Sequence, residues 1–332
     1  MQRNRTRLKD IAVATGYSAN TVSLALRGSP RIPEETRGRI QLAAQSLNYF
    51  PNTIAQALVS RVTRTIGLVL TDIMNPTLTL VSRFLERELA QRGYSLMLAA
   101  SDFVPDKELS ALEVFRSRQV DGILIFPTNH DRLEHIRAVR QAGYPVLILA
   151  DIPMAGLDVV AVNDRTGGYR AVRHLIERGH RRIILLDAAQ AENSEKRDGA
   201  LRAVREAGLP EAALVVVRPR GHSATEGYEA IAGAILGKER PTALFATTDW
   251  LAIGVMRWCR EQGLSVPGDL AIVGYDNTEA ADFSSVPITS IDYAAAEVSR
   301  HAVERILSLI GKPSPSPIVT LIDPELVIRQ ST

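Results

Sequence analysis

Residues 8–27 have the sequence LKDIAVATGYSANTVSLALR, and this stretch determines how the start of the chain folds. Apolar side chains recur at helical spacing through residues 8–15, and Gly16-Tyr17-Ser18 then interrupts the pattern. Ser18 is a residue type suited to the N-cap of a second helix over residues 19–26. Two short helices joined by a glycine-containing turn predict a helix-turn-helix.

The second of these helices leaves small side chains on the face that its core does not use. Val22, Ala25 and Leu26 are spaced to pack inward. A helix that reads base edges enters a groove about 12 Å wide, which short outward side chains allow. We therefore expect contacts with double-stranded DNA from Ser18, Ala19, Asn20, Thr21, Ser23, Leu24 and Arg27.

A third helix is expected over residues 33–47, where proline suits the first turn and Glu34 and Glu35 lie near the positive end of the helix dipole. Residues 1–64 contain ten Lys or Arg and three Asp or Glu, whereas residues 65–332 contain 29 and 34. This asymmetry predicts a polyanion as the partner of the basic head. A basic solubilising tail is the alternative, but a tail would lack helical periodicity. The expected phosphate contacts are Arg27, Arg31, Arg37 and Arg39.

A short segment joins this head to the rest of the chain. Residues 47–52, LNYFPN, end the third helix, and residues 53–60 are compatible with a helix. A run of this length does not hold a stable helix alone. The segment is therefore either a linker or a helix that forms on DNA.

The head closely resembles that of the lac repressor family of bacterial transcription regulators. The resemblance rests on Leu8-Lys9-Asp10-Ile11-Ala12, Gly16-Tyr17-Ser18, Thr21-Val22-Ser23, Thr36-Arg37 and Leu47-Asn48-Tyr49-Phe50-Pro51-Asn52. It implies a DNA-binding head over residues 1–50, and a hinge helix with its linker over residues 51–63 that pairs with its copy in the minor groove. Leu58 matches the leucine that wedges between base pairs in that family, and the bent duplex repays the cost of unstacking. The hinge contacts that the resemblance implies are Asn52, Ala55, Gln56 and Leu58.

Three positions of the head depart from the family pattern. Leu24 stands where a polar residue usually reads a base, and it can contact a thymine methyl but cannot bond to guanine in bidentate fashion. Arg27 replaces a common Asn. The operator is therefore expected to differ from the commonest family half-site at the position that Leu24 faces. Arg7 stands where a capping Thr is usual, so Thr6 is expected to cap the first helix one residue early.

Beyond the head, short apolar runs alternate with longer amphipathic stretches. Such alternation predicts parallel, doubly wound sheets covered by helices. About ten strands are too many for one domain of this kind, so we expect two lobes that enclose a cleft. The N-terminal lobe is expected at about residues 64–162 plus 290–322, and the C-terminal lobe at about residues 163–289 plus the C-terminal end.

This body also resembles the family's effector domain, which is similar to sugar-binding proteins of the bacterial periplasm. The matching stretches include Asn75-Pro76, Arg92-Gly93-Tyr94, Val120-Asp121-Gly122-Ile123 and Val273-Gly274-Tyr275-Asp276. The resemblance covers essentially the whole chain. It implies a small all-α helix-turn-helix head plus an α/β two-lobed, periplasmic-binding-protein-like effector and dimerisation domain over residues 64–332.

Polar side chains that follow strands are the candidates for binding an effector, because ligands of doubly wound folds bind outside the carboxyl ends of the strands. Each of them has an alternative role in a solvated loop, a turn or a helix cap. Asp276 matches the ligand carboxylate of the family, and the resemblance also brings in Thr77 and His222. The candidate effector-binding residues are Asn75, Thr77, Thr128, Asp151, Lys196, Arg197, His222, Thr248 and Asp276.

The candidate pocket differs from the family pattern in its charges and its aromatic residues. Lys196 stands where the family has an arginine, and a lysine offers a point charge in place of a bidentate fork. Thr77 and Leu78 stand where aromatic residues are frequent, which weakens stacking on a sugar face. A phosphorylated or carboxylated effector would suit Lys196 and Arg197. The effector is therefore expected to be a sugar, a sugar derivative or another small metabolite.

Other kinds of chemistry lack support in the sequence. No stretch reaches the roughly 18 consecutive apolar residues of a membrane-spanning helix, and the first thirty residues have no apolar signal core. The single Cys259 fits a reducing cytoplasm, where we expect the protein to act. The histidines are scattered, and no phosphate loop, dinucleotide fingerprint or nucleophile elbow occurs. We expect no metal, no cofactor and no catalytic activity.

These observations favour a transcriptional repressor that binds a pseudo-palindromic operator as a homodimer, under the control of a small molecule in the interlobe cleft. The alternative is a solute-binding receptor of the periplasmic type without a role in DNA regulation. An enzyme ranks third, since no nucleophile and base can be paired.

Overall fold

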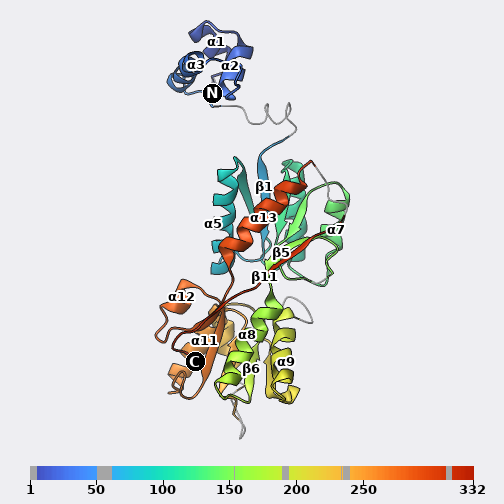
Figure 1. Cartoon of the computed structure of the whole chain (residues 1–332), viewed down its shortest axis with the longest axis vertical. Coiled ribbons are helices and arrows are strands. Elements are labelled where there is room, and N and C mark those ends of the chain that lie inside the picture. Colours follow the sequence, from blue (N-terminus) through green and yellow to red (C-terminus); the bar gives the residue numbers. More distant parts are fainter. Residues whose placement is uncertain are drawn as a thin grey trace. The chain divides into compact units, whose positions relative to one another are not determined.

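The structure is a computed structural model that describes residues 6–50, 62–152, 154–188, 194–232, 234, 240–311 and 316–332 (Figure 1). The chain divides into two compact units, Met1–Thr63 and Arg64–Thr332. The expected hinge helix, with Asn52, Ala55, Gln56 and Leu58, lies outside the described residues.

The first unit contains the expected helix-turn-helix and a third helix. Its helices are α1 (Leu8–Thr15), α2 (Ala19–Leu26) and α3 (Glu34–Ser46). Gly16 ends α1 at a φ of 75°, in the left-handed region that glycine enters at little cost. The Ser18 side chain then accepts a hydrogen bond from the Thr21 amide, so it caps α2 as predicted. The core of this unit is made of Ile11, Val22, Ala25, Ile40 and Ala44.

One detail of the head differs from the sequence-based expectation. The Thr6 hydroxyl donates a hydrogen bond of 2.8 Å to the Leu47 carbonyl at the end of α3, and it does not cap α1. Arg7 occupies the N-cap position, and its amide donates to the Asp10 carboxylate at 2.7 Å. Thr6 therefore ties the start of the head to the end of its third helix.

The second unit consists of two lobes, each built on a six-stranded sheet. The sheet of the first lobe has the order β11-β5-β4-β3-β1-β2 and is parallel throughout. Its strands are β1 (Thr65–Leu70), β2 (Ser95–Ala100), β3 (Gly122–Ile125), β4 (Val146–Ile148), β5 (Asp158–Val162) and β11 (Val319–Ile322). Its helices are α5 (Pro76–Gln91), α6 (Pro105–Ser117), α7 (Glu134–Gln141) and α13 (Ala295–Leu309).

The sheet of the second lobe has the order β12-β10-β9-β8-β6-β7, and only β12 runs antiparallel to its neighbour. Its strands are β6 (Ile183–Leu186), β7 (Leu214–Val217), β8 (Ala243–Ala246), β9 (Ala271–Asp276), β10 (Thr289–Asp292) and β12 (Leu326–Val327). Its helices are α8 (Asp164–Glu177), α9 (Glu195–Glu206), the 3-10 turn η1 (Glu211–Ala213), α10 (Ala224–Ile231), α11 (Asp249–Glu261) and α12 (Glu279–Asp282). The predicted fold class is confirmed.

The chain crosses between the lobes after β5, after β10 and after β11 (Figure 1). Strand β10 pairs with β9 in the second lobe, so residues 290–292 lie there and not in the first lobe, where they were expected. The two-residue strand β12 and the four-residue helix α12 are too short to leave a periodic signal, and the sequence did not predict them.

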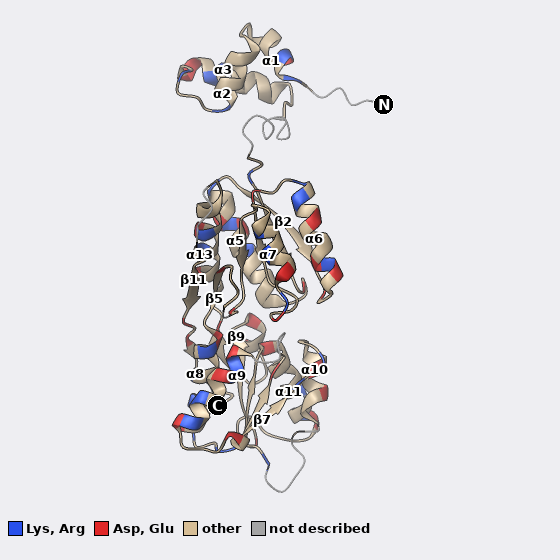
Figure 2. Cartoon of the chain, turned by 90° about the vertical axis from the view of Figure 1, so that its right-hand side faces the viewer, with Lys and Arg blue, Asp and Glu red and all other residues tan. Residues whose placement is uncertain are grey.

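The central strands of both sheets are buried on their two faces, as in parallel sheets generally, whereas the edge strands β2, β7 and β11 are partly exposed. In the first lobe, Ile66, Leu68 and Leu70 of β1 point toward α5 and α13, whereas Val69 points toward α6 and α7. This alternation is the period of two that a strand imposes. Charged residues accordingly lie on the helices and loops, and the strands of both lobes are largely free of them (Figure 2).

A buried ion-pair cluster holds four elements of the first lobe together. The side chain of Asp158 at the start of β5 is fully buried and pairs with Arg140 of α7 at 2.5 Å and with Arg305 of α13. The Ile318 amide, next to β11, donates to the same carboxylate at 3.0 Å. These bonds satisfy a carboxylate that would otherwise be costly to bury.

Candidate functional site

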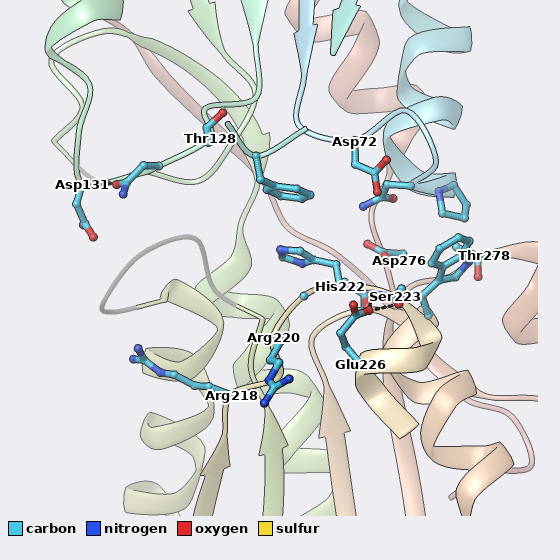
Figure 3. Close-up of a pocket in the computed structure, with 17 residues that line it drawn as sticks. Asp72, Thr128, Asp131, Arg218, Arg220, His222, Ser223, Glu226, Asp276 and Thr278 are labelled. Atoms are coloured by element: carbon cyan, nitrogen blue, oxygen red, sulfur yellow. Dashed lines mark hydrogen bonds between the residues drawn. The ribbon is translucent and has the colours of Figure 1, made fainter. Parts of the chain in front are cut away.

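Two contiguous cavities open between the lobes at the carboxyl ends of their strands. Their volumes are about 670 Å³ for the outer cavity and about 360 Å³ for the inner one. Figure 3 shows Asp72, Thr128 and Asp131 of the first lobe on one side, and Arg218, Arg220 and His222 of the second lobe on the other. The residues that line both cavities are Asn75, Phe103, Asp131, His222, Thr248 and Asp276.

Asn75 and Thr77 enter the cleft because α5 begins there. The Asn75 side chain caps this helix and accepts hydrogen bonds from the amides of Thr77 at 2.9 Å and Leu78 at 3.4 Å. Pro76 occupies the first helical position, where its missing N–H costs nothing. Thr77 is 4% exposed, and its hydroxyl oxygen has no hydrogen-bond partner among the described residues.

Asp276 lies at the end of β9 in an unusual backbone conformation. Its φ is 111°, and Asn277 after it has a φ of 54°. Hydrogen bonds hold this turn, since Arg329 donates to the Asn277 side chain at 2.6 Å and the Asn277 amide donates to Ser290 at 3.0 Å. Strain of this kind persists where the surrounding structure fixes it, often at binding sites. Burial raises the pKa of Asp276 well above its usual range, although Lys196 partly opposes this.

Lys196 is placed by an unusually close contact between α8 and α9. A Cβ on Gly168 would lie 2.0 Å from the Lys196 carbonyl oxygen, so only glycine allows this approach. The Lys196 ammonium donates to the Thr247 carbonyl at 3.2 Å, lies 3.7 Å from the Asp164 carboxylate and sits 3.7 Å from the centre of the Tyr275 ring. Its charge is therefore already engaged by groups of the protein.

Carboxylates dominate the inner cavity. Burial, together with the charges of Asp164 and Glu195, raises the pKa of Asp151 to about 7. Burial also raises the pKa of Asp187, against the hydrogen bond that Ser194 donates to it. Asp164 accepts a hydrogen bond of 2.6 Å from the Tyr275 hydroxyl.

An aromatic pair spans the cleft. The ring of Phe103, which follows β2, stacks on the imidazole of His222, which follows β7, with centroids 4.9 Å apart and planes inclined by 7°. Burial, aided by the charge of Lys196, lowers the pKa of His222 to about 4, so the imidazole is neutral at neutral pH. Asp102 and Phe103 both have positive φ, at 50° and 58°.

Thr128 and Thr248 are held by networks behind the cleft wall. The Thr128 amide donates to the buried Glu108 at 2.6 Å, and the Thr128 hydroxyl meets that of Ser101 at 2.9 Å. Glu108 also bonds to His135 at 2.5 Å. Thr248 caps α11 and accepts from the Leu251 amide at 3.2 Å. Both threonines are therefore fixed in position.

The structure places eight of the nine candidate effector residues in the cavity lining. Arg197 belongs to the lining of neither cavity, so its expected role toward an anionic effector lacks support. Sequence reasoning missed Phe103, Arg218, Arg220, Trp250 and Tyr293. Phe103 lies three residues after the end of β2, so a search of the residues that follow each strand would have found it if it had included aromatic side chains.

In the head, the candidate DNA contacts lie on and around α2. Ala19 and Asn20 are exposed, whereas Leu24 is partly buried. The Arg27 guanidinium folds back along the helix and donates to the Ser23 hydroxyl at 2.8 Å. Ser18 and Thr21 share a hydroxyl contact of 2.8 Å in the helix cap. Ser18, Asn20, Thr21 and Ser23 supply the short polar side chains of this face.

Two of the expected phosphate contacts have roles inside the head. Arg37 donates to the carbonyls of Ser29 and Ile32 and pairs with Glu34 at 2.6 Å, so it braces the loop before α3. Arg39 lies over the Tyr17 ring at 5.7 Å from its centre, at the exposed surface.

Some arrangements are absent from the part of the chain that the structure describes. No helix there combines the length and the apolar character needed to cross a membrane. No cluster of three or more His, Cys, Asp or Glu side chains in that part is arranged to hold a metal ion. Ser223 and Glu226 in the outer cavity bond to each other and cap α10 (Figure 3), which accounts for their proximity.

Comparison with protein families gives two matches along the chain. Residues 7–52 match the family described as bacterial regulatory proteins, lacI family. Residues 172–332 match the periplasmic binding protein-like domain. The two matches fall on the helix-turn-helix head and mainly on the second lobe of the body.

The chain is similar over nearly its full length to transcriptional regulators of other bacteria. It is 32% identical to the HTH-type transcriptional regulator DegA of Bacillus subtilis, over 99% of this chain and 98% of that protein. It is 31% identical to the HTH-type transcriptional repressor PurR of Vibrio atlanticus, over 98% of each. It is 30% identical to catabolite control protein A of Priestia megaterium, over 97% of this chain and 98% of that protein.

Solved structures share the fold. A lac repressor dimer bound to operator and the anti-inducer ONPF has a TM-score of 0.85 at 24% identity, over 99% of each chain. A lacI-family regulator of Enterococcus faecium with bound ribose has a TM-score of 0.72 at 26% identity, over 81% of this chain and 98% of that one.

Proposed function

This chain belongs to the lacI family of bacterial regulatory proteins, and we propose that it is a homodimeric repressor whose operator affinity is set by a small molecule in the interlobe cleft. As a member of this family, it is a DNA-binding transcriptional regulator. We assign base reading to the outward face of α2 and to the hinge segment, and effector binding to the two cavities between the lobes.

The observation that carries this proposal is the composition of the cavity lining. Asp151 and Thr128 come from the first lobe, and Lys196, His222 and Asp276 come from the second. A molecule that contacts both lobes binds one lobe orientation better than another, and this difference in affinity shifts the equilibrium between them. If DNA binding favours one orientation, effector and operator must alter each other's affinity by the same factor.

A homodimer follows from the way that a short head reads DNA. One α2 helix covers only a few base pairs, so a two-fold dimer that reads two half-sites gains specificity, and its operator is a pseudo-palindrome. The lac repressor, whose fold this chain shares, is a dimer in its operator-bound structure. The protein then acts in the cytoplasm, where the DNA is.

The test is a selection of bound duplexes from a random library with the purified full chain, without and with an extract of cellular metabolites. The expected result is a two-fold symmetric consensus in at least one of the two selections. A double variant, Asn20→Ala with Ser23→Ala, serves as the control and should recover no such consensus. If neither selection yields a symmetric sequence while small molecules still bind, the chain is a solute receptor and the proposal is wrong.

A further inference from the structure

The inner cavity of the cleft is an acidic chamber. Six carboxylates line it, whereas Lys196 is the one Lys or Arg among the described residues of that lining. His130, His222 and Tyr293 complete its ionisable groups. The six acidic residues of this acidic chamber are Asp131, Asp151, Asp164, Asp187, Glu195 and Asp276.

Lys196, the one Lys or Arg of the acidic chamber's described lining, is already engaged by Asp164, the Thr247 carbonyl and the Tyr275 ring. Arg165, which lines neither cavity, pairs with Glu195 at 2.7 Å and with Asp198 at 3.3 Å. Arg218 and Arg220 line the outer cavity instead. A phosphate or carboxylate inside the acidic chamber would therefore lie among six carboxyl groups, and burying such like charges together is costly.

Three of the carboxylates, Asp151, Asp164 and Asp276, line the inner cavity together with Tyr293. Burial raises the pKa of the Tyr293 phenol, and the charges of these three carboxylates raise it further. The Tyr293 hydroxyl itself points to the Leu149 carbonyl at 3.4 Å. These carboxylates accept hydrogen bonds and, while ionised, can donate none.

The hydroxyl and amide groups around the chamber are mostly used within the protein. The Thr247 hydroxyl donates to the Leu186 carbonyl at 3.1 Å, and Thr248 and Asn75 accept from backbone amides as helix caps. The exception is Thr77, whose buried hydroxyl lowers the pKa of Asp276 but has no partner in hydrogen-bonding geometry among the described residues. The acidic chamber thus presents acceptors and one unused buried hydroxyl.

We propose that the effector of this protein carries a protonated amine, which binds among Asp151, Asp164 and Asp276 of the acidic chamber. An ammonium group brings three donors, no acceptor and one positive charge, which complements a lining of this kind. A neutral polyol would supply donors but no positive charge, so it would not favour the ionised forms of Asp151 and Asp276, whose pKa values burial raises. This inference rests on the proposed function of the cleft as the effector site.

The test compares matched pairs of compounds that differ in one amino group. Thermal melting and titration calorimetry of the full chain at neutral pH would use glucosamine against glucose, putrescine against 1,4-butanediol, and ethanolamine against ethylene glycol. Glucose 6-phosphate represents the anionic alternative. We expect at least one amine to bind about tenfold more tightly than its hydroxyl counterpart, the factor that one modest charge-assisted contact provides.

Two variants test whether the preference for an amine depends on Asp276. Asp276→Asn should remove about a tenfold preference for the amine, and it should fold well because asparagine has the same size and carries no charge at a site where burial raises the pKa of the carboxyl. The exposed Glu229→Gln on α10 removes one charge outside the cavities and should leave the preference unchanged. The inference is overturned if no amine exceeds its counterpart, if glucose 6-phosphate binds best, or if Asp276→Asn keeps the preference.

This result is separable from the test of the proposed function. Operator selection with the same preparation reports on the head and on dimer symmetry, whatever the effector. An operator consensus without an amine preference would refute only the proposal that the effector is an amine. An amine preference without any operator consensus would refute the proposed role as a repressor and support the proposed ligand class.

Discussion

Phe103 of the first lobe and His222 of the second lobe stack face to face across the cleft, with ring centroids 4.9 Å apart. Each residue follows a strand of its own lobe, so the pair links the lobes at the wall of the effector cavities. Two successive residues with positive φ, Asp102 and Phe103, present the phenyl ring. The turn therefore stores strain that the contact helps to stabilise.

Replacing Phe103 with alanine should loosen the contact between the lobes. An aromatic pair contributes about 0.5–1.5 kcal/mol beyond the area that it buries, so the melting temperature of the full chain should fall by a few degrees. Because the lobes then reorient more easily, the dependence of operator affinity on effector should change as well. Fluorescence anisotropy with a labelled operator measures this change.

Phe283→Ala is the matched control for that variant, because Phe283 is 82% exposed and lines neither cavity. It should leave both the cleft and the effector response unaltered. If Phe103→Ala and Phe283→Ala behave alike in both measurements, the stacked pair has no part in coupling the lobes.

Stability should depend on pH through Asp151. Its pKa in the folded protein is raised to about 7 from an ordinary value of 3.8, so the unfolded chain loses this proton first. The folded state is therefore relatively favoured below pH 3.8, and this contribution is lost as the pH rises to about 7. Asp151→Asn carries no charge and should avoid the loss.

We therefore expect Asp151→Asn to be more stable than the natural chain at pH 8 but not at pH 4. Each pKa unit corresponds to about 1.4 kcal/mol, so the gain in the free energy of unfolding should be on the order of 2 kcal/mol after solvent screening. Urea unfolding at the two pH values measures it, with the exposed Glu113→Gln as control. An equal effect of Asp151→Asn at both pH values would contradict the assignment.

The architecture could be predicted because its signals are local. The apolar runs that form β2, β7 and β8 indicate strands in the sequence, since strands of parallel sheets are nearly continuously hydrophobic. Asp276, Asp151 and Thr128 could be placed in the cleft for a related reason, because the carboxyl ends of parallel strands meet at one edge of a sheet.

The features that the sequence did not predict depend on contacts between residues that are distant along the chain. Lys196 could be selected from the sequence, but its engagement by Thr247 and Tyr275 depends on how closely α8 and α9 pack, which Gly168 permits. Arg37 looks available to DNA in the sequence, yet it bonds to carbonyls of a loop whose path is a tertiary feature. Neither the contacts of Lys196 nor those of Arg37 produce a periodic pattern in the sequence.

Asp158 should be essential for the stability of the first lobe. Its buried carboxylate joins Arg140, Arg305 and the Ile318 amide. Asp158→Ala would remove the carboxylate that pairs with Arg140 and Arg305, and breaking a buried pair in this way costs about 3–5 kcal/mol. Urea unfolding should show the loss, and operator binding by the head should persist at temperatures where the variant is folded.

Glu211→Ala provides the comparison, because Glu211 pairs with Arg205 at 2.7 Å in a bridge whose side chains are 59% and 60% exposed. Exposed bridges of this kind contribute little, so this variant should unfold like the natural chain. Equal losses from Asp158→Ala and Glu211→Ala would mean that burial does not decide the role of Asp158.

Asn20 and Arg39 should separate sequence reading from phosphate binding in the head. Asn20 is exposed on α2 among short side chains, whereas Arg39 lies on α3 over the Tyr17 ring. If Asn20 reads a base, Asn20→Ala should cost about 1–3 kcal/mol on the selected operator and relax the preference at one position of each half-site. Arg39→Ala should instead weaken all sequences alike and reduce the slope of log K against log salt by about one. Binding titrations at several salt concentrations, on the operator and on single-base variants of it, measure both effects. If Asn20→Ala weakens the binding of every sequence equally and reduces the salt slope, Asn20 contacts the phosphate backbone and does not read a base.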